Sequence, residues 1–532
     1  MAVTRPTSRL VALTATRDRD SVAGTGGATP RSKPCYAVAI AFSALACSSD
    51  VGLATRAQEP SAPVLEAFAF SAVNNPIRVD SQARIREGEV RIFLPPGTPR
   101  GALRPTFGTS TGASVRVGGT LQTSGTSALD FTAPVRYVVA APGGRERRYV
   151  VTVVTDLAAF DDVVESLVQR YHIPAVSIAV THDERLVYLK AYGWADLVAR
   201  ERATTQSRFR LASVSKPITA IAILRLAEQG KLRLSDRVFG PGALLGTIYG
   251  TQPYEPRLRE ITVDHFLHHT AGGWTNDAAD PMFAQRALSG GELISWTLDH
   301  RPLAHAPGTS YAYSNFGYCL LGRIIERVTG QPYEQAVKAL VLEPAGITDM
   351  AIGGGTLAER LPGEVRYHGQ GHDDPYLLDP RRMDAHGGWV ATARDLAQLL
   401  VHVDGYSAKP DLLQPSSIET MTTGSSAKPG YACGWGVNAN GNWEHMGGMP
   451  GTATLIIRGA NGWGFVLLAN SRSPDQRFVR DMDLVLWTAL ARLDGAPEYD
   501  LFVADSSQVD SVAPQAQPYQ TGADSISAIP TR

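Results

Sequence analysis

The tetrapeptide Ser213-Val214-Ser215-Lys216 lies between a short strand-like segment and an apolar run that Gly230 closes. The apolar residues of that run recur at helical spacing, namely Ile218, Ile221, Leu224 and Leu226. Pro217 allows such a helix only if it lies in the first turn, where its missing N–H group does little harm. The pattern therefore predicts a helix that begins next to Ser213 and leaves unpaired backbone N–H groups at that end.

Serine and lysine three residues apart on a helix share one face, so the Ser213 hydroxyl can meet the Lys216 amine. A serine hydroxyl alone is a poor nucleophile, and a lysine whose pKa is lowered by burial can act as its base. Chance also produces this spacing, since Ser425-Ser426-Ala427-Lys428 repeats it. That second copy precedes Pro429-Gly430, a loop composition with no helix to hold the two side chains together. The first copy is therefore the candidate nucleophile.

A second candidate group, Tyr313-Ser314-Asn315, precedes another predicted helix that ends at Gly330. A phenol beside an ammonium group can lose its proton below its usual pKa and serve as a general base. The Asn315 amide can orient the lysine or a substrate carbonyl. Tyr311 is an alternative base, but only Tyr313 has an asparagine two residues later.

A third group, His445-Met446-Gly447-Gly448, precedes a predicted hairpin over Thr452 to Arg458 and Trp463 to Asn470. Glycines there would let a strand backbone approach a substrate closely. His386-Gly387-Gly388 offers the same His-x-Gly pattern but precedes a helix start. We therefore prefer His445 for the third group and a structural role for His386.

Taken in this order, the three groups resemble the motifs of the serine β-lactamase and penicillin-binding-protein superfamily, in its class C-like branch of esterases and D-aminopeptidases. The resemblance spans roughly residues 157 to 495. It includes these supporting strings: Leu267-His268-His269-Thr270-Ala271-Gly272-Gly273, Gly387-Gly388-Trp389-Val390-Ala391-Thr392-Ala393-Arg394-Asp395 and Gly434-Trp435-Gly436.

The resemblance implies a catalytic role for each of three residues. Ser213 would be the acylating nucleophile and Lys216 its proton partner. Tyr313 would be the base that activates Ser213 and later the deacylating water. No metal or cofactor is expected.

The resemblance also implies the residues that bind substrate. Asn315 would contact the substrate and hold Lys216, and the N–H groups of Ser213 and Gly448 would form the oxyanion hole. His445, followed by Gly447, would replace the lysine of the family's Lys-Thr-Gly motif. A histidine is only partly charged near neutrality and shorter than lysine, so the replacement favours esterases and aminopeptidases over enzymes that recognise a β-lactam carboxylate.

The domain organisation follows from the distribution of strand and helix patterns. Residues 156–495 have strands at both ends and helices between, which predicts an α+β fold with one antiparallel sheet flanked by helices. Residues 63–155 have short alternating segments, with a hairpin about Pro142-Gly143-Gly144, and predict a small all-β immunoglobulin-like sandwich. Residues 496–532 are rich in Ser, Ala, Gln and Asp and predict a disordered tail.

Residues 1–62 have the composition of an export signal and linker. Arg31 and Lys33 precede an apolar run from Tyr36 to Ala46 that is too short to span a bilayer. Cys47 follows Ala44-Leu45-Ala46, which resembles a bacterial lipobox and implies membrane anchoring through a lipidated cysteine. We expect an exported protein that is periplasmic, a membrane-anchored lipoprotein or secreted.

The formal net charge of -1 and the lack of a basic, aromatic-studded stripe give no reason to expect a nucleic-acid partner. The predicted function is that of an exported serine hydrolase that acts through an acyl-enzyme on small ester or D-amino-acyl amide substrates. One alternative is a β-lactamase or DD-peptidase acting on β-lactams or peptidoglycan stem peptides. Another is a non-catalytic cell-envelope binding protein.

Overall fold

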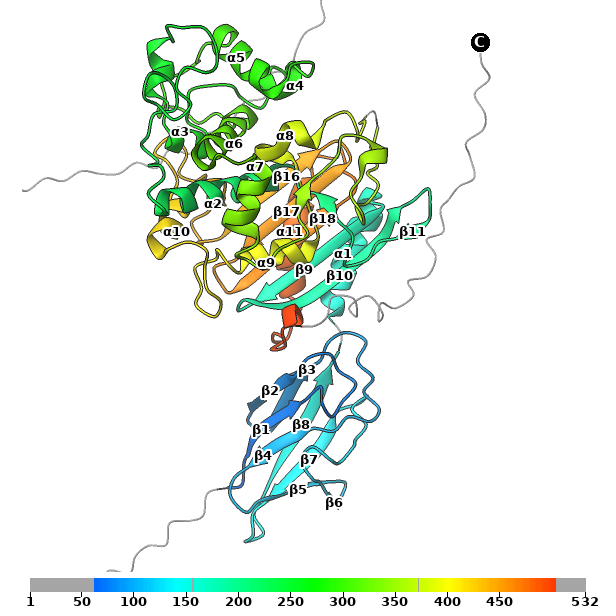
Figure 1. Ribbon diagram of the computed structural model, residues 1–532. Coiled ribbons are helices and arrows are strands. Elements are labelled where there is room, and N and C mark those ends of the chain that lie inside the picture. The colour runs from blue at the N-terminus through cyan, green and yellow to red at the C-terminus, as the bar shows by residue number, and fades with distance from the viewer. Residues whose placement is uncertain (1–61, 156, 372, 504–532) are drawn as a thin grey trace, which may run out of the picture. The chain divides into compact units, whose positions relative to one another are not determined.

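The structure is a computed structural model that describes residues 62–503 except 156 and 372 (Figure 1). The predicted export signal with Cys47 and most of the predicted C-terminal tail lie outside the described residues. An all-β unit comes first along the chain, and a larger unit of helices and strands follows it.

The first eight strands follow the order β4-β1-β2-β3-β8-β7-β5-β6, and β3 and β8 are the parallel pair. The ring of Phe68 on β1 packs edge to face on Tyr137 of β7 at 5.6 Å, although three strands separate β1 from β7 in that order. The sheet therefore folds over on itself around a core, as in the predicted sandwich, and the predicted hairpin is β7–β8. The strands are β1 (Leu65–Phe70), β2 (Ser81–Arg86), β3 (Glu89–Phe93), β4 (Thr106–Thr109), β5 (Ser114–Val117), β6 (Thr120–Leu121), β7 (Val135–Ala140) and β8 (Glu146–Val154).

A seven-stranded antiparallel sheet organises the second unit, in the order β11-β10-β9-β18-β17-β16-β15. An early strand, β9, pairs with a late one, β18, so that Val176 lies opposite Ala469. This confirms the predicted sheet built from both ends of the region. The strands are β9 (Ala175–His182), β10 (Arg185–Asp196), β11 (Glu201–Arg202), β15 (Gly436–Val437), β16 (Trp443–Met449), β17 (Thr452–Arg458) and β18 (Trp463–Ala469). A small second sheet consists of β12 (Phe209–Arg210), β13 (Ala351–Ile352) and β14 (Trp389–Ala391).

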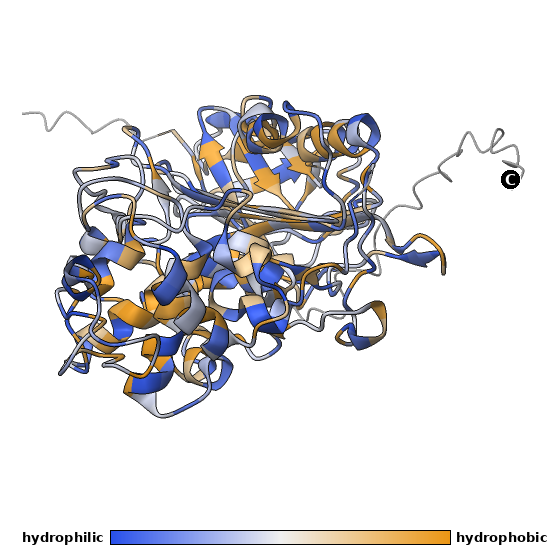
Figure 2. Ribbon diagram, turned by 90° about the horizontal axis from the view of Figure 1, so that it is seen from above, coloured by the Kyte–Doolittle hydropathy of each residue, from blue (hydrophilic) through white to orange (hydrophobic). Residues whose placement is uncertain are grey.

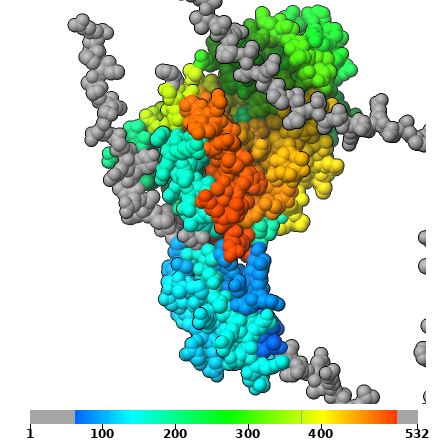
Figure 3. Space-filling view, turned by 180° about the vertical axis from the view of Figure 1, so that it is seen from behind, coloured from blue at the N-terminus to red at the C-terminus, as the bar shows by residue number. Residues whose placement is uncertain are grey.

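The central strands β9, β17 and β18 are buried at almost every position, so both faces of the sheet need a cover of helices. Figure 2 shows the sheet edge-on between two layers. One layer is α1 (Ala158–Tyr171) and α11 (Phe478–Leu490), which lie side by side in Figure 3 with the Tyr171 and Phe478 rings 5.0 Å apart. The predicted α+β fold, an antiparallel sheet flanked by helices, is confirmed.

The other helices build the part of the fold that surrounds α2. They are α2 (Ser215–Glu228), α3 (Val263–Leu267), α4 (Pro281–Ala284), α5 (Gly290–His300), α6 (Asn315–Thr329), α7 (Tyr333–Val337), α8 (Pro380–Gly387), α9 (Ala393–Leu400) and α10 (Pro415–Thr422). Short helical turns are η1 (Ala212–Val214), η2 (Pro256–Glu260), η3 (Lys338–Leu342), η4 (Leu357–Glu359) and η5 (Leu501–Val503). Within residues 62–503, no helix combines the length and apolarity needed to cross a membrane.

The folded chain continues beyond residue 496, where the sequence predicts the start of a disordered tail. Tyr499 is buried and donates its hydroxyl to the Val187 carbonyl of β10 at 2.9 Å. Asp500 accepts the Leu186 backbone N–H at 3.0 Å, and Leu501 is buried. The predicted tail over 496–532 is therefore wrong for residues 496–503, because β10 offers these side chains a surface that composition does not reveal.

Candidate active site

Ser213 lies in the one-turn helix η1, directly before α2. Pro217 occupies the first turn of α2, and Gly230 follows the helix with a φ of 66°, as the sequence predicts. β12 precedes η1, so the strand–turn–helix context of the tetrapeptide is confirmed. Ala212 has a φ of 48°, a left-handed conformation that costs a residue with a side chain about 1–3 kcal/mol.

Neighbouring strands hold this strained segment in place. The Leu211 backbone N–H donates to the Trp389 carbonyl of β14 at 2.8 Å, and the Thr454 hydroxyl of β17 donates to the Leu211 carbonyl at 2.7 Å. A Cβ at Gly447 would lie 2.2 Å from that carbonyl oxygen and 2.1 Å from Thr454 Oγ1. Because Gly447 has no side chain, the backbone of β16 can lie close to Leu211, two residues before Ser213. The next residue, Gly448, is exposed.

Lys216 is fully buried at 0% exposure, and its Nζ has three oxygen neighbours. These are Ser213 Oγ at 3.0 Å, Asn315 Oδ1 at 2.8 Å and the His386 carbonyl at 2.9 Å. Burial lowers the pKa of Lys216 to about 7, and the negative charge of Asp280 acts in the opposite direction. Two of the three oxygens can only accept, whereas the serine hydroxyl can also donate.

A neutral Lys216 therefore fits the site as well as a charged one. Its two N–H groups satisfy Asn315 Oδ1 and the His386 carbonyl, and its lone pair then faces the Ser213 hydroxyl proton. A lysine with a pKa near 7 exchanges between these two forms near neutral pH.

Asn315 begins α6, and Ser314 before it caps the helix by accepting the Gly317 N–H at 3.0 Å. Asn315 Nδ2 donates to Asp280 Oδ2 at 2.9 Å. Sequence reasoning missed Asp280, since its loop showed no recognisable motif. The dipeptide Asp280-Pro281 signals a helix start, which is α4, but nothing in it points to Lys216.

Tyr313 lies against the Ser213–Lys216 pair. Its hydroxyl forms a hydrogen bond with the Ser213 side chain, and its ring centroid lies 4.8 Å from Lys216 Nζ. Burial nevertheless raises the pKa of Tyr313 well above its usual value. The expectation that a nearby ammonium would lower this pKa is corrected, because loss of solvent outweighs the attraction.

His445 lies on β16 with both ring nitrogens engaged. Nδ1 is 2.8 Å from the Met446 carbonyl and must donate to it, so Nε2 of the neutral ring accepts from the Tyr431 hydroxyl at 3.1 Å. Tyr431 in turn lies 3.1 Å from His269 Nε2, and His269 Nδ1 accepts the Ser314 N–H at 3.1 Å. Burial lowers the pKa of His445 to about 3, assisted by the charge of Lys216.

His445 is thus neutral, and neither of its nitrogens is free to serve as the cation that a Lys-Thr-Gly motif supplies. Tyr431 and His269 complete this chain of hydrogen bonds and were not among the predicted site residues. His269 belongs to a string that the family resemblance had singled out, but only the tertiary fold brings it to β16.

The alternatives considered in the sequence occupy other positions. His386 contributes its carbonyl to Lys216, whereas its ring is buried against Phe283 at 6.3 Å. Ser425 Oγ accepts the backbone N–H of Lys428 at 3.2 Å, and the exposed Lys428 has its Nζ 5.7 Å from the centroid of the Tyr311 ring. Tyr311 packs on His269 at 5.9 Å between ring centroids.

A small cavity of about 100 Å³ lies between α4 and α8. It is lined by Met282, Phe283, Arg286, Leu377, Leu378, Asp379, Arg382 and Met383. Met383 packs with Ala212, the residue before Ser213, and with Met449 at the end of β16. Among residues 62–503, no cluster of His, Cys, Asp and Glu side chains has the arrangement of a metal site.

A serine–lysine–tyrosine cluster at the start of a buried helix, beside an antiparallel sheet built from both ends of the region, defines the serine β-lactamase and penicillin-binding-protein class of serine hydrolases. Residues 160–489 match the family model described as Beta-lactamase, and the chain belongs to this family. Residues 69–153 match the model described as SGBP, N-terminal.

Two curated proteins illustrate the relationship. Esterase EstB of Burkholderia gladioli is 35% identical over 236 residues, which are 42% of this chain and 56% of the esterase. A putative D-alanyl-D-alanine carboxypeptidase of Escherichia coli strain K12 is 27% identical over 310 residues, which are 50% of this chain and 69% of that protein. The chain thus spans little more than half the length of EstB.

Solved structures share the fold. The octameric penicillin-binding protein homologue from Pyrococcus abyssi superimposes with a TM-score of 0.52 at 23% identity, covering 63% of this chain and 78% of that one. The D-amino acid amidase from Ochrobactrum anthropi SV3 gives a TM-score of 0.52 at 20% identity, covering 63% of this chain and 98% of the amidase.

Proposed function

We propose that this protein is an exported serine hydrolase that acts through an acyl-enzyme at Ser213. The observation that carries the proposal is the buried Lys216 amine 3.0 Å from Ser213 Oγ, with its other two hydrogen-bond positions taken by acceptors. Such an amine, when neutral, has its lone pair available only to the serine proton. Family membership supports the same chemistry.

The reaction begins when Ser213 Oγ attacks the substrate carbonyl carbon. Its proton moves to Lys216 Nζ, and the negative charge that develops on the carbonyl oxygen is held by the N–H groups of Ser213 and Gly448. Collapse of the tetrahedral intermediate breaks the bond to the leaving group, which takes up a proton from Lys216. Water then attacks the acyl carbon by the same route and regenerates Ser213.

Lys216 is a better candidate than Tyr313 for the base in this scheme. The pKa of Lys216 is lowered to about 7, whereas that of Tyr313 is raised by burial. A phenol that stays protonated can donate a hydrogen bond to Ser213 or pass a proton to the leaving group. We therefore assign Tyr313 to relaying the proton from Lys216 to the leaving group rather than to the initial activation.

Esters and D-amino-acyl amides are the proposed substrates. A neutral His445 with both nitrogens engaged supplies no positive charge for the carboxylate of a β-lactam. The similarity to an esterase supports the same choice.

Activity on peptidoglycan stem peptides is the second candidate, favoured by the similarity to a putative D-alanyl-D-alanine carboxypeptidase. A fluorescent penicillin distinguishes the two, since it acylates enzymes that accept a D-alanyl-D-alanine mimic. Labelling by this reagent at a rate comparable to that of an ester would place the peptidase function first.

A fluorophosphonate probe tests the central claim. The serine oxygen displaces fluoride from phosphorus and its proton passes to Lys216, so the adduct remains on the nucleophile. We expect mass spectrometry to find the adduct on Ser213 and to find none in Ser213→Ala, whereas Ser425→Ala should label like the wild type. An adduct on Ser425 would overturn the proposal by moving the nucleophile to the second Ser-x-x-Lys sequence. No adduct at all would overturn it in favour of a non-catalytic envelope protein.

Export is supported by the sequence of residues 31–47 alone, which lie outside the described residues. We propose that the mature protein begins near Cys47 and that this cysteine is lipidated. Mass spectrometry of the N-terminal peptide checks this: an unacylated N-terminus in a soluble fraction would exclude the lipid anchor.

A further inference from the structure

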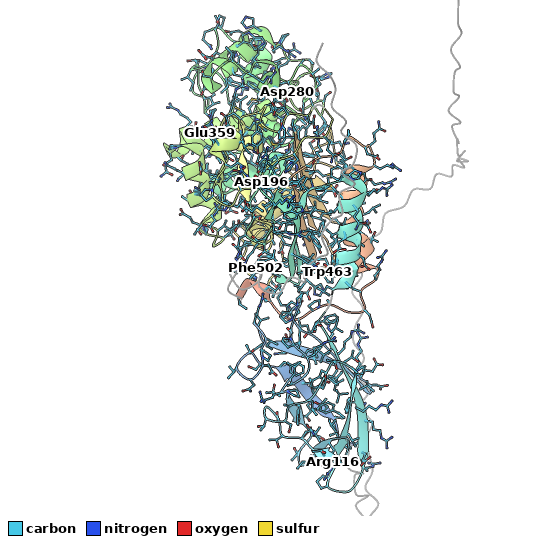
Figure 4. All side chains as sticks on the ribbon, turned by 90° about the vertical axis from the view of Figure 1, so that its right-hand side faces the viewer. Arg116, Asp196, Asp280, Glu359, Trp463 and Phe502 are labelled. Carbon is cyan, nitrogen blue, oxygen red and sulfur yellow. The ribbon has the colours of Figure 1, made fainter. Side chains whose placement is uncertain are left out.

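Asp280 is a fully buried carboxylate beside the site that belongs to none of the three motifs (labelled in Figure 4). Its Oδ1 accepts the Met282 backbone N–H at 2.9 Å and so caps α4. Its Oδ2 accepts from Asn315 Nδ2 at 2.9 Å. Capping a helix of only four residues does not offset the cost of burying a carboxylate, so the bond to Asn315 calls for another explanation.

The bond to Asp280 determines which way the Asn315 amide faces. An asparagine side chain can turn by half a rotation with little change of shape, which exchanges its donor for its acceptor. Turning this amide would set Oδ1 against the Asp280 carboxylate and an NH₂ group against Lys216. Asp280 therefore fixes Oδ1 as the acceptor that lies 2.8 Å from Lys216 Nζ.

Asp280 is also the anionic neighbour of Lys216 within the described residues. The other titratable side chains around the amine come from the loops before α4 and α6, from α6, α8 and β16, and they are His269, Tyr313, Tyr318, His386 and His445. Burial keeps all of them uncharged at neutral pH by lowering the pKa of each histidine and raising that of each tyrosine. Burial raises the pKa of Asp280 to about 6, which leaves it largely ionised at pH 7 and above.

We propose that Asp280 is a positioning residue for acyl transfer: through the Asn315 amide it holds the Lys216 amine so that the lone pair points at Ser213 Oγ. The inference rests on the function proposed above for Ser213. It explains why a carboxylate is buried two side chains away from the nucleophile, where it touches neither serine nor substrate.

The test is the rate of fluorophosphonate labelling of Ser213 between pH 5 and 10, in the full chain. For the wild type we expect the rate to rise with a midpoint near pH 7 as Lys216 loses its proton. Asp280→Asn removes the charge that favours the ammonium form, so the midpoint should fall by about one pH unit. The plateau rate should also fall about tenfold or more, because the Asn315 amide is no longer fixed.

A second variant and a matched control separate positioning from folding. Asp280→Ser keeps a good helix cap but is too short to reach Asn315, so it should show the same two changes. Glu165→Gln alters an exposed carboxylate on α1, in the other helix layer, and should leave the profile unchanged.

Each outcome decides one question. If both Asp280 variants show a lower plateau of the labelling rate but an unchanged pH midpoint, Asp280 is only a structural residue and the inference is overturned. The inference is also overturned if the variants label with the same pH profile as the wild type. Absence of labelling at Ser213 in the wild type would instead overturn the proposed function itself.

Discussion

Lys216 is buried among uncharged groups and one carboxylate, that of Asp280, and burial outweighs the attraction of that charge, which leaves the pKa of Lys216 near neutrality. Arginine has a similar charge and length but cannot lose its proton in a protein. The difference between the two side chains therefore tests whether the site needs a base or only a cation.

Lys216→Arg should slow labelling of Ser213 by about 10²- to 10⁴-fold, the usual contribution of a general base, and should abolish the rise near pH 7. The measurement is the second-order labelling rate across pH. Lys428→Arg, in the second copy of the spacing, is the control and should label within about twofold of the wild type. An active Lys216→Arg variant would mean that the amine serves only as a positive charge.

The adjacent residues His268 and His269 differ in charge: their partners hold His268 as a cation and leave His269 neutral. Burial alone would lower the pKa of His268, but hydrogen bonds with Asp264 and Cys433 raise it to about 11. Its two ring nitrogens lie 3.1 Å from Asp264 Oδ1 and 3.1 Å from the Thr423 carbonyl, both acceptors, so the ring is a cation. His269 faces one donor and stays neutral.

His268→Asn should therefore destabilise the fold by about 2 kcal/mol at pH 6, the usual contribution of hydrogen bonds to a charged group. Because the folded-state pKa is raised, this contribution is complete below the unfolded pKa near 6.5 and declines as the pH rises toward 11. Urea unfolding at pH 6 and at pH 9.5 should show the deficit shrinking. His300→Asn is an exposed control, and an equal deficit at both pH values would refute the charged state.

The residues that sequence reasoning found are those that stand in short sequence motifs. Ser213 and Lys216 are three apart in the consecutive helices η1 and α2, and Tyr313 and Asn315 flank a helix cap. Asp280, His269 and Tyr431 were missed because each gains its role from a partner on another element. The sequence predicted that the His445 side chain binds substrate for the same reason. Its hydrogen bonds with the Tyr431 hydroxyl and the Met446 carbonyl are visible only in the folded structure.

Strand β16 passes close to Leu211, two residues before Ser213. Gly447 makes this approach feasible, since any Cβ there would overlap the Leu211 carbonyl oxygen at 2.2 Å. A Cβ on Gly448 would meet only the Arg472 side chain, at an ordinary 3.7 Å. The structure therefore has room for a side chain at Gly448 but not at the adjacent Gly447.

Gly447→Ala should shift β16 away from Leu211, cost about 1–3 kcal/mol of stability, and slow Ser213 labelling at least tenfold. Gly448→Ala keeps the backbone N–H group and should unfold within about 0.5 kcal/mol of the wild type. Thermal unfolding and probe labelling check both variants. Equal stability of the two alanine variants would contradict the close approach.

The elements were predictable where a pattern repeats along the chain. Strands β17 and β18 and the helix after Ser213 matched their predicted bounds within a few residues, because continuous apolar runs and helical spacing mark them. Strands β12 and β13 have only two residues each, too few to show an alternating pattern of apolar residues. They form by pairing with β14, which is distant in sequence. Gly447 was recognised, but as a substrate contact rather than as the spacer beside Leu211.

At the scale of the whole molecule, the folded hydrolase region includes residues after Gly495, which the composition of the sequence had predicted to be disordered. The segment after Gly495 places Tyr499 and Leu501 on the sheet, and the Arg394 guanidinium donates to the Phe502 carbonyl at 2.7 Å. These contacts tie the end of the described chain to β10 and to α9.

A chain that ends after Gly495 should lose about 3–6 kcal/mol of stability, since it exposes the surface covered by two large apolar side chains. A chain that ends after Val503 keeps every contact described above and should unfold like the full-length protein. Urea denaturation of the three lengths is the measurement. If the shorter chain is as stable as the longer one, the packing of Tyr499 on β10 contributes nothing.

The pairing of β9 with β18 also determines when, during synthesis of the chain, the sheet can form. The Ala175 N–H donates to Asn470 Oδ1 at 2.7 Å across 295 residues of sequence, and Thr454, which holds the Leu211 carbonyl, is also made late. Contacts so distant form slowly and only after the last strand has been synthesised. A nascent chain that carries Ser213 and Lys216 therefore lacks the support that orients them. On the function proposed above, the serine becomes reactive only when the sheet has been synthesised in full.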